Sequence, residues 1–128
     1  MASIAKLAGS IAAGQSISNA VNTGGNYVVG LIMPAVWTQA RMTVSVSTDN
    51  VAYNDMFVFN AESTTASEFE FNVVPNAVVS VDSDRFLMAR YIKLRSGTRD
   101  APIIQPALRL FYIITVNAVT VQQASVEL

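Results

Sequence analysis

The alternation of apolar and polar residues in short segments is the feature that most restricts the fold of this chain. In residues 42–47, apolar side chains alternate with hydroxyl side chains: Met42, Val44 and Val46 against Thr43, Ser45 and Ser47. A period of two places alternate side chains on opposite faces of a β-strand. The segment is therefore predicted to be a strand with one buried face and one face in water.

Segments with a similar alternation, or with a higher apolar content, recur between turn residues. They are residues 26–33, 53–59, 68–73, 86–95 and 108–116. Asp49 and Asn50 tolerate turn conformations, so they predict a hairpin between residues 42–47 and 53–59. Apolar residues occupy both even and odd positions of residues 108–116, so both faces of this strand are predicted to be largely covered. Residues 119–128 are a candidate for one further strand.

The first 25 residues differ from the rest of the chain because they are rich in Ala, Ser, Gly and Asn. Their first half carries the only helical spacing in the chain, at Ile4, Leu7 and Ile11. We therefore expect an N-terminal arm at residues 1–25, extended or with a short helix, before a single domain at residues 26–128. Many short strands without a long helix predict an all-β, antiparallel β-sandwich, jelly-roll-like in its architecture.

The composition points to protein partners. Of the 128 residues, 52% are hydrophobic and 13% are charged, whereas about 25% of residues are charged in a typical soluble domain. Such a surface is expected to be covered in part by neighbouring chains, which predicts a homo-oligomer. The net charge of −1 gives no field that attracts nucleic acid or an acidic membrane. The longest apolar run, residues 27–37, contains Gly30 and Pro34 and is too short to span a bilayer.

The chain contains neither histidine nor cysteine. The commonest general base, the commonest transition-metal ligand and the thiol nucleophile are therefore all missing. Asp82 and Asp84 could approach a calcium ion together, but a calcium site needs more oxygen ligands than this pair supplies. The sequence thus predicts a protein that is not an enzyme and has no cofactor and no metal.

Basic residues cluster between positions 85 and 109, where Asp100 is the single acid. The cluster comprises Arg85, Arg90, Lys93, Arg95, Arg99 and Arg109. A contact with a neighbouring subunit is the first interpretation, and a solvated face with salt bridges to Glu68, Glu70 or Asp82 is the second. Nucleic acid ranks third, because aromatic side chains for base stacking are not interleaved.

Four motifs, in this order, resemble a group of small structural proteins of tailed phages and prophages. They are Ala13-Gly14-Gln15-Ser16-Ile17-Ser18, Met33-Pro34-Ala35-Val36-Trp37-Thr38-Gln39-Ala40, Val46-Ser47-Thr48-Asp49 and Tyr91-Ile92-Lys93-Leu94-Arg95-Ser96-Gly97-Thr98. The resemblance implies a β-sandwich component of the virion, of the decoration, cement or head-fibre kind. Its implied partners are the major capsid protein or other virion proteins. Residues 37–53 are also similar to sugar-binding jelly rolls of the discoidin type.

Two sets of contact residues follow from these hypotheses. In the virion hypothesis, Ile4, Leu7 and Ile11 attach the arm to the capsid or to a neighbouring copy. The alternative is a carbohydrate-binding adhesion module of the virion, in which Trp37 or Tyr53 stacks on a sugar. Exposure of the Trp37 ring separates the two, because a buried ring cannot contact a glycan.

Overall fold

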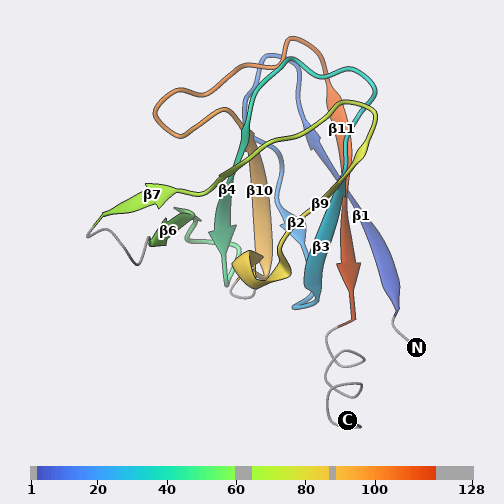
Figure 1. Ribbon diagram of the computed structural model, residues 1–128, viewed down its shortest axis with the longest axis vertical. Helices are drawn as coiled ribbons and strands as arrows, with labels where there is room; N and C mark the ends of the chain where they lie inside the picture. The colour runs from blue at the N-terminus through green and yellow to red at the C-terminus, as the bar shows by residue number, and fades with distance from the viewer. Residues whose placement is uncertain (1–2, 60–64, 87–88, 118–128) are drawn as a thin grey trace, which may run out of the picture.

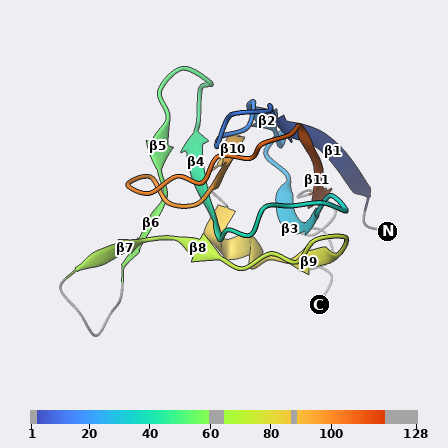
Figure 2. The ribbon, with the colours of Figure 1, turned by 90° about the horizontal axis from the view of Figure 1, so that it is seen from above.

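The structure is a computed structural model that describes residues 3–59, 65–86 and 89–117. Two antiparallel sheets pack face to face, as Figures 1 and 2 show from the side and from above. Sheet 1 has the order β1 (Ile4–Ile11), β11 (Arg109–Val116), β3 (Tyr27–Ile32), β9 (Val78–Ser80). Sheet 2 has the order β2 (Val21–Asn22), β10 (Tyr91–Ser96), β4 (Met42–Ser47), β5 (Asn54–Asp55), and β8 (Glu70–Phe71) also pairs with β4.

Two smaller elements complete the described chain. β6 (Phe57–Phe59) pairs with β7 (Ala66–Glu68) in a separate two-stranded sheet, which projects to the left of the sandwich in Figure 1. The 3-10 helix η1 (Ser83–Phe86) precedes β10. No helix of the described residues is long and apolar enough to cross a membrane.

The strand pairs are nested. β1 pairs with β11, β2 with β10, β3 with β9 and β4 with β5, all antiparallel. The chain therefore follows the path of one long hairpin rolled into two sheets, which is the order of a jelly roll. The predicted all-β sandwich is confirmed, and the structure supplies the strand order that the sequence patterns left open.

Alternate residues of both sheets point inward and form the core. Sheet 1 contributes Ile11, Val28, Leu31, Phe111 and Ile113, and sheet 2 contributes Met42, Val44, Ile92 and Leu94. Each such side chain contributes about 1.5–3 kcal/mol when it is fully buried. The Phe111 ring fits because it lies against Gly9, where an added Cβ would sit 2.5 Å from its Cζ atom.

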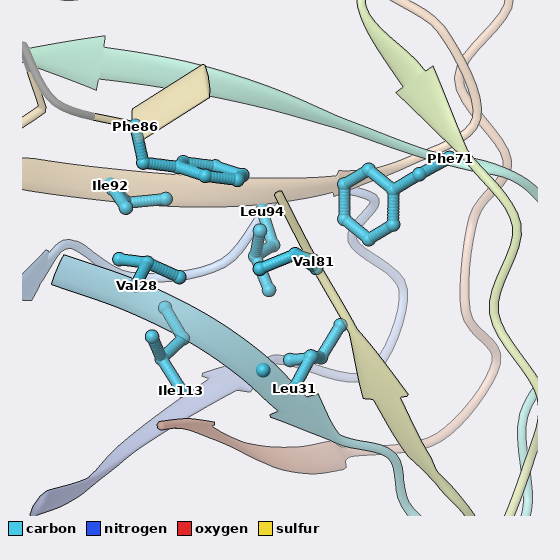
Figure 3. Close-up of a pocket in the computed structure, with 9 residues that line it drawn as sticks. Val28, Leu31, Phe71, Val81, Phe86, Ile92, Leu94 and Ile113 are labelled. Carbon is cyan, nitrogen blue, oxygen red and sulfur yellow. The ribbon is translucent and has the colours of Figure 1, made fainter. Parts of the chain in front are cut away.

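The space left between the sheets is too small for a ligand. Figure 3 shows nine apolar residues, among them Leu31, Phe86 and Ile92, around a cavity of about 10 Å³. That volume corresponds to about one water molecule, and a buried water needs polar partners that this lining lacks. This cavity can therefore hold neither a substrate nor a cofactor.

Gln105 anchors the long connection between β10 and β11. It is fully buried, and its Oε1 accepts hydrogen bonds from the Thr38 N–H and from Arg109 Nε, each at 3.0 Å. Its Nε2 donates to the Thr38 carbonyl at 3.0 Å and to Ser96 Oγ at 2.8 Å. The network ties the connection to the ends of two strands and to the loop before β4, and it satisfies the polar atoms of Gln105 in the interior.

The N-terminal segment differs from its prediction. No helix lies in residues 3–25; this segment supplies β1 to sheet 1 and β2 to sheet 2. It is thus part of the sandwich and not an arm outside it. The helical spacing was misleading because only three apolar residues carried it, whereas β1 pairs with β11 along its whole length.

The predictions for residues 42–59 hold in outline. β4 and β5 form the expected hairpin, and Asn50 takes a left-handed φ of 62° in its turn. The expected wet face of β4 is wrong, since Thr43, Ser45 and Ser47 are buried. Neighbouring segments cover them; the Thr43 hydroxyl, for example, donates to the Gly97 carbonyl at 2.8 Å. The candidate strand at residues 119–128 lies outside the described residues.

Replacing Gln105 with alanine tests the role of the buried network. Gln105→Ala removes the partners of Thr38, Ser96 and Arg109 at once, and unsatisfied buried groups cost about 1–3 kcal/mol each. We expect a loss of about 3 kcal/mol in the free energy of unfolding, measured in urea. Gln39→Ala, at an exposed position, is the matched control and should change this free energy by less than about 0.5 kcal/mol. Equal losses in the two variants would contradict the role given to Gln105.

Candidate functional site

The outer face of sheet 1 is the most distinctive surface of the described chain. Residues of β1, β11, β3 and β9 that point away from the core line up in rows across the strands. The rows are Ile4–Val116–Tyr27, Lys6–Ile114–Gly30–Ser80, Ala8–Tyr112–Ile32–Val78 and Ser10–Leu110. Apolar side chains therefore dominate a face that points to solvent. We call it the outer face of sheet 1.

Several of these side chains are open to solvent. Ile4 is 72% exposed, Val78 65% and Leu110 55%, and Leu108, just before β11, is 57% exposed. In β11 only the odd-numbered residues, such as Phe111, are buried. The described chain itself covers only one face of residues 108–116, because no described segment packs over the outer one. Contiguous exposed apolar surface of this kind typically marks an interaction site.

Lys6 is the one charged side chain in these rows. Its Nζ lies 4.5 Å from the centroid of the Tyr112 ring on the neighbouring strand. A cation above an aromatic face contributes about 0.5–1 kcal/mol at an exposed site. The outer face thus combines a broad apolar surface with a single positive charge and no acidic side chain in its rows.

The three predicted attachment residues do not share a face. Ile4 lies on the outer face, Leu7 packs partly against the core and Ile11 is fully buried. A strand turns alternate residues to opposite sides, so the spacing that unites them on a helix separates them here. Sequence reasoning missed Leu110, Tyr112 and Val78, although the apolar residues at both parities of 108–116 were a usable signal.

The two residues of the carbohydrate hypothesis lie in different surroundings. Trp37 is only 8% exposed, and its Nε1 donates to the Ala40 carbonyl at 3.4 Å. Its ring is therefore unavailable for stacking on a sugar, which corrects that assignment. Tyr53 is half-buried, with Lys93 Nζ 4.3 Å from its ring centroid and a hydrogen bond from its hydroxyl to Asn50. Burial, followed by the charges of Tyr91 and Asp49, raises the pKa of Tyr53 above its usual value.

Three of the basic residues at positions 85–109 are engaged in contacts within the described chain. Arg95 pairs with Asp55 at 2.8 Å and with Glu68 at 3.3 Å. Arg99 lies 3.9 Å from Asp55 and also covers the ring of Phe57. Arg109 is buried in the Gln105 network. These contacts favour the salt-bridged interpretation for Arg95, and they attach the β6–β7 sheet to the sandwich.

Metal binding has no obvious site in the parts of the chain that the structure describes. No group of three or more Asp or Glu side chains lies close enough there to hold an ion. Asp55 and Glu68 both form ion pairs with Arg95.

No family model, no curated protein and no solved structure matches this chain. Its function must therefore be inferred from its surfaces.

The turn after β4 gives a prediction about pH. Asp49 Oδ1 accepts hydrogen bonds from the Val51 N–H at 2.9 Å and the Ala52 N–H at 3.0 Å. These bonds, with one from the Ser47 hydroxyl, hold the pKa of Asp49 below its ordinary value of 3.8. The contribution of the ionised carboxylate to stability is therefore complete above the unfolded pKa and is lost as the pH falls through the folded pKa.

We expect an NMR titration to give Asp49 a pKa below 3.8. Between about pH 5 and about pH 2, the wild type should lose more stability than Asp49→Asn, which keeps the acceptor and removes the charge. Parallel losses in the two proteins would show that the turn does not stabilise the carboxylate.

Proposed function

We propose that this protein is a structural component of a tailed-phage virion that attaches to the capsid or to neighbouring subunits through the outer face of sheet 1. It would act as a decoration, cement or fibre-base component. The observation that carries this proposal is the exposed apolar surface formed by Ile4, Val78 and Leu110 with the half-buried side chains between them. No catalytic residue is proposed.

Burial of this face would favour attachment. Covering an exposed side chain such as Ile4 or Leu110 contributes up to about 1.5–3 kcal/mol before the cost of association. A weak contact becomes effective when it is repeated over many copies on one particle. A largely apolar sheet face therefore suits a protein that lies on a repetitive protein lattice.

The topology supports the same assignment. Jelly rolls recur in viral capsid proteins and in lectins, and a fold alone does not assign function. The sequence motifs around Trp37 and Tyr91 resemble tailed-phage structural proteins, which favours the virion over the other uses of the fold. The carbohydrate alternative has less support, because Trp37 lies in the core and Lys93 covers one side of Tyr53.

A single charge on the outer face tests the proposal. Leu110→Lys places an ammonium at an exposed position of the apolar surface, where it would have to be desolvated on docking. We expect binding to particles stripped of the protein to weaken at least about tenfold in a co-sedimentation assay, which corresponds to about 1.4 kcal/mol. The matched control is Val51→Lys, which changes a residue 83% exposed in the β4–β5 turn.

Loss of binding in Leu110→Lys alone supports the outer face as the docking surface. Equal binding of both variants and the wild type, or loss in Val51→Lys alone, would refute it, and a glycan array with Tyr53→Ala would then test the alternative. Deleting residues 1–14 is a poorer test, since it removes β1 and its part of the core.

A further inference from the structure

We infer that two copies of this chain pair through the free edges of their β1 strands, antiparallel across a two-fold axis. Their two sheets 1 then form one continuous sheet, and their outer faces form one continuous surface. The inference deepens the proposed function, on which it rests, by naming a second copy as a partner of the same sheet.

The edge at β1 differs from the other sheet edges. Sheet 1 ends on β1, with 8 residues, and on β9, with 3 residues. Sheet 2 ends on β2 and β5, with 2 residues each. Short edge strands are a common protection against pairing with other chains, and β1 lacks this protection. It lies at the right of the sandwich in Figure 1, and no described strand pairs with its open side.

Hydrogen bonds at the two ends of β1 show which groups face the open edge. The Asn117 N–H donates to the Ser3 carbonyl at 3.0 Å, so residue 3 bonds toward β11. With the observed register, odd-numbered residues of β1 bond to β11 and even-numbered residues point their N–H and C=O groups outward. Ser10 agrees, because its N–H donates to Asn19 Oδ1 at 2.9 Å and its carbonyl accepts from the Asn19 N–H at 3.2 Å.

Asn19 thus closes the edge at Ser10, while the backbone groups of Ile4, Lys6 and Ala8 have no partner among the described residues. Nothing in the strand obstructs this edge. β1 contains no proline, and its pairing with β11 runs without a bulge. The Lys6 ammonium lies above the sheet, over the Tyr112 ring, and not across the edge. An extended strand can therefore bind here.

A second β1 is the occupant that best fits these groups. An antiparallel strand is complementary to itself across a two-fold axis. Lys6 opposite Lys6 is unfavourable, because like charges directly opposite destabilise a sheet. The register with Ala5 on the axis avoids that contact and sets Ile4 of each copy opposite Lys6 of the other. Registers with the axis at Leu7 or Ala8 also avoid it, but they use Ser10, whose groups are already bonded to Asn19. A register with the axis at Ile4 forms one hydrogen-bonded pair within β1, whereas the register at Ala5 forms two.

Disulfide trapping tests both the partner and the register. The chain has no cysteine, so one introduced cysteine can only bridge two copies. Residues on the axis form a non-hydrogen-bonded pair with Cα atoms about 4.5 Å apart, within the disulfide range. We expect Ala5→Cys to convert almost fully to a covalent dimer under mild oxidation, and the wild type to be a dimer by light scattering.

Val78→Cys is the control, because it lies on the outer face at the opposite edge and should remain mostly monomeric under the same oxidation. A wild-type chain that stays monomeric at every concentration would overturn the inference. So would a Val78→Cys variant that cross-links as fast as Ala5→Cys, since that result would indicate face-to-face association.

A proline substitution tests the edge hydrogen bonds separately. Lys6→Pro removes an N–H that points away from β11, and proline is tolerated at such edge positions. Lys6→Ala removes the same side chain and keeps the N–H. We expect Lys6→Pro to raise the dimer dissociation constant at least about tenfold over Lys6→Ala, with folding checked by circular dichroism. Equal constants in two folded variants would contradict the inference, and the cysteine pair decides if Lys6→Pro does not fold.

The two proposals fail separately. If Ala5→Cys does not cross-link while Leu110→Lys still weakens particle binding, the β1 pairing is wrong and the docking face stands. If Ala5→Cys cross-links and Leu110→Lys binds particles normally, the pairing is right and the proposed capsid contact is wrong.

Discussion

The pairing of β11 with β1 on one side and β3 on the other is the interaction on which the rest of this structure depends. It joins the last described strand to the first and so closes the nested order of the jelly roll. The odd-numbered residues of β11 include Phe111 and Ile113, which lie in the core, where Gly9 leaves room for the Phe111 ring. The even-numbered residues of β11 form the centre of the outer face. The same strand therefore builds the fold and the proposed docking surface.

Local patterns predicted the local structure. The alternation in residues 42–47 and the Asp49-Asn50 turn gave β4 and its hairpin with β5, because both depend on neighbours in the sequence. The nested order was out of reach, since the pairing of Ile4 with Val116 leaves no trace in either segment alone. The short N-terminal helix was wrong, because the spacing of three apolar residues was a weak helical signal and pairing with β11 outweighed it.

The candidate site was predictable only in part. Apolar residues at even and odd positions of 108–116 predicted that both faces of the strand are covered. They did not reveal that the chain itself covers only one of them. Trp37 illustrates the same limit, because a lone aromatic residue reveals neither burial nor exposure before the fold is known. Arg95 likewise meets Asp55 and Glu68 through pairing of distant strands, which turned a basic segment of the sequence into a set of ion pairs.

Amide hydrogen exchange, resolved residue by residue by NMR, tests most directly whether sheet 1 is the surface through which the protein assembles. In the dilute, separated chain, the amides of Leu7 and Gly9 should exchange slowly because they bond to β11, and that of Lys6 should exchange rapidly. On association, the account predicts that exchange at Lys6 slows while exchange in β4 and β10 is unchanged. Unchanged exchange throughout β1, with slowing confined to sheet 2, would contradict it.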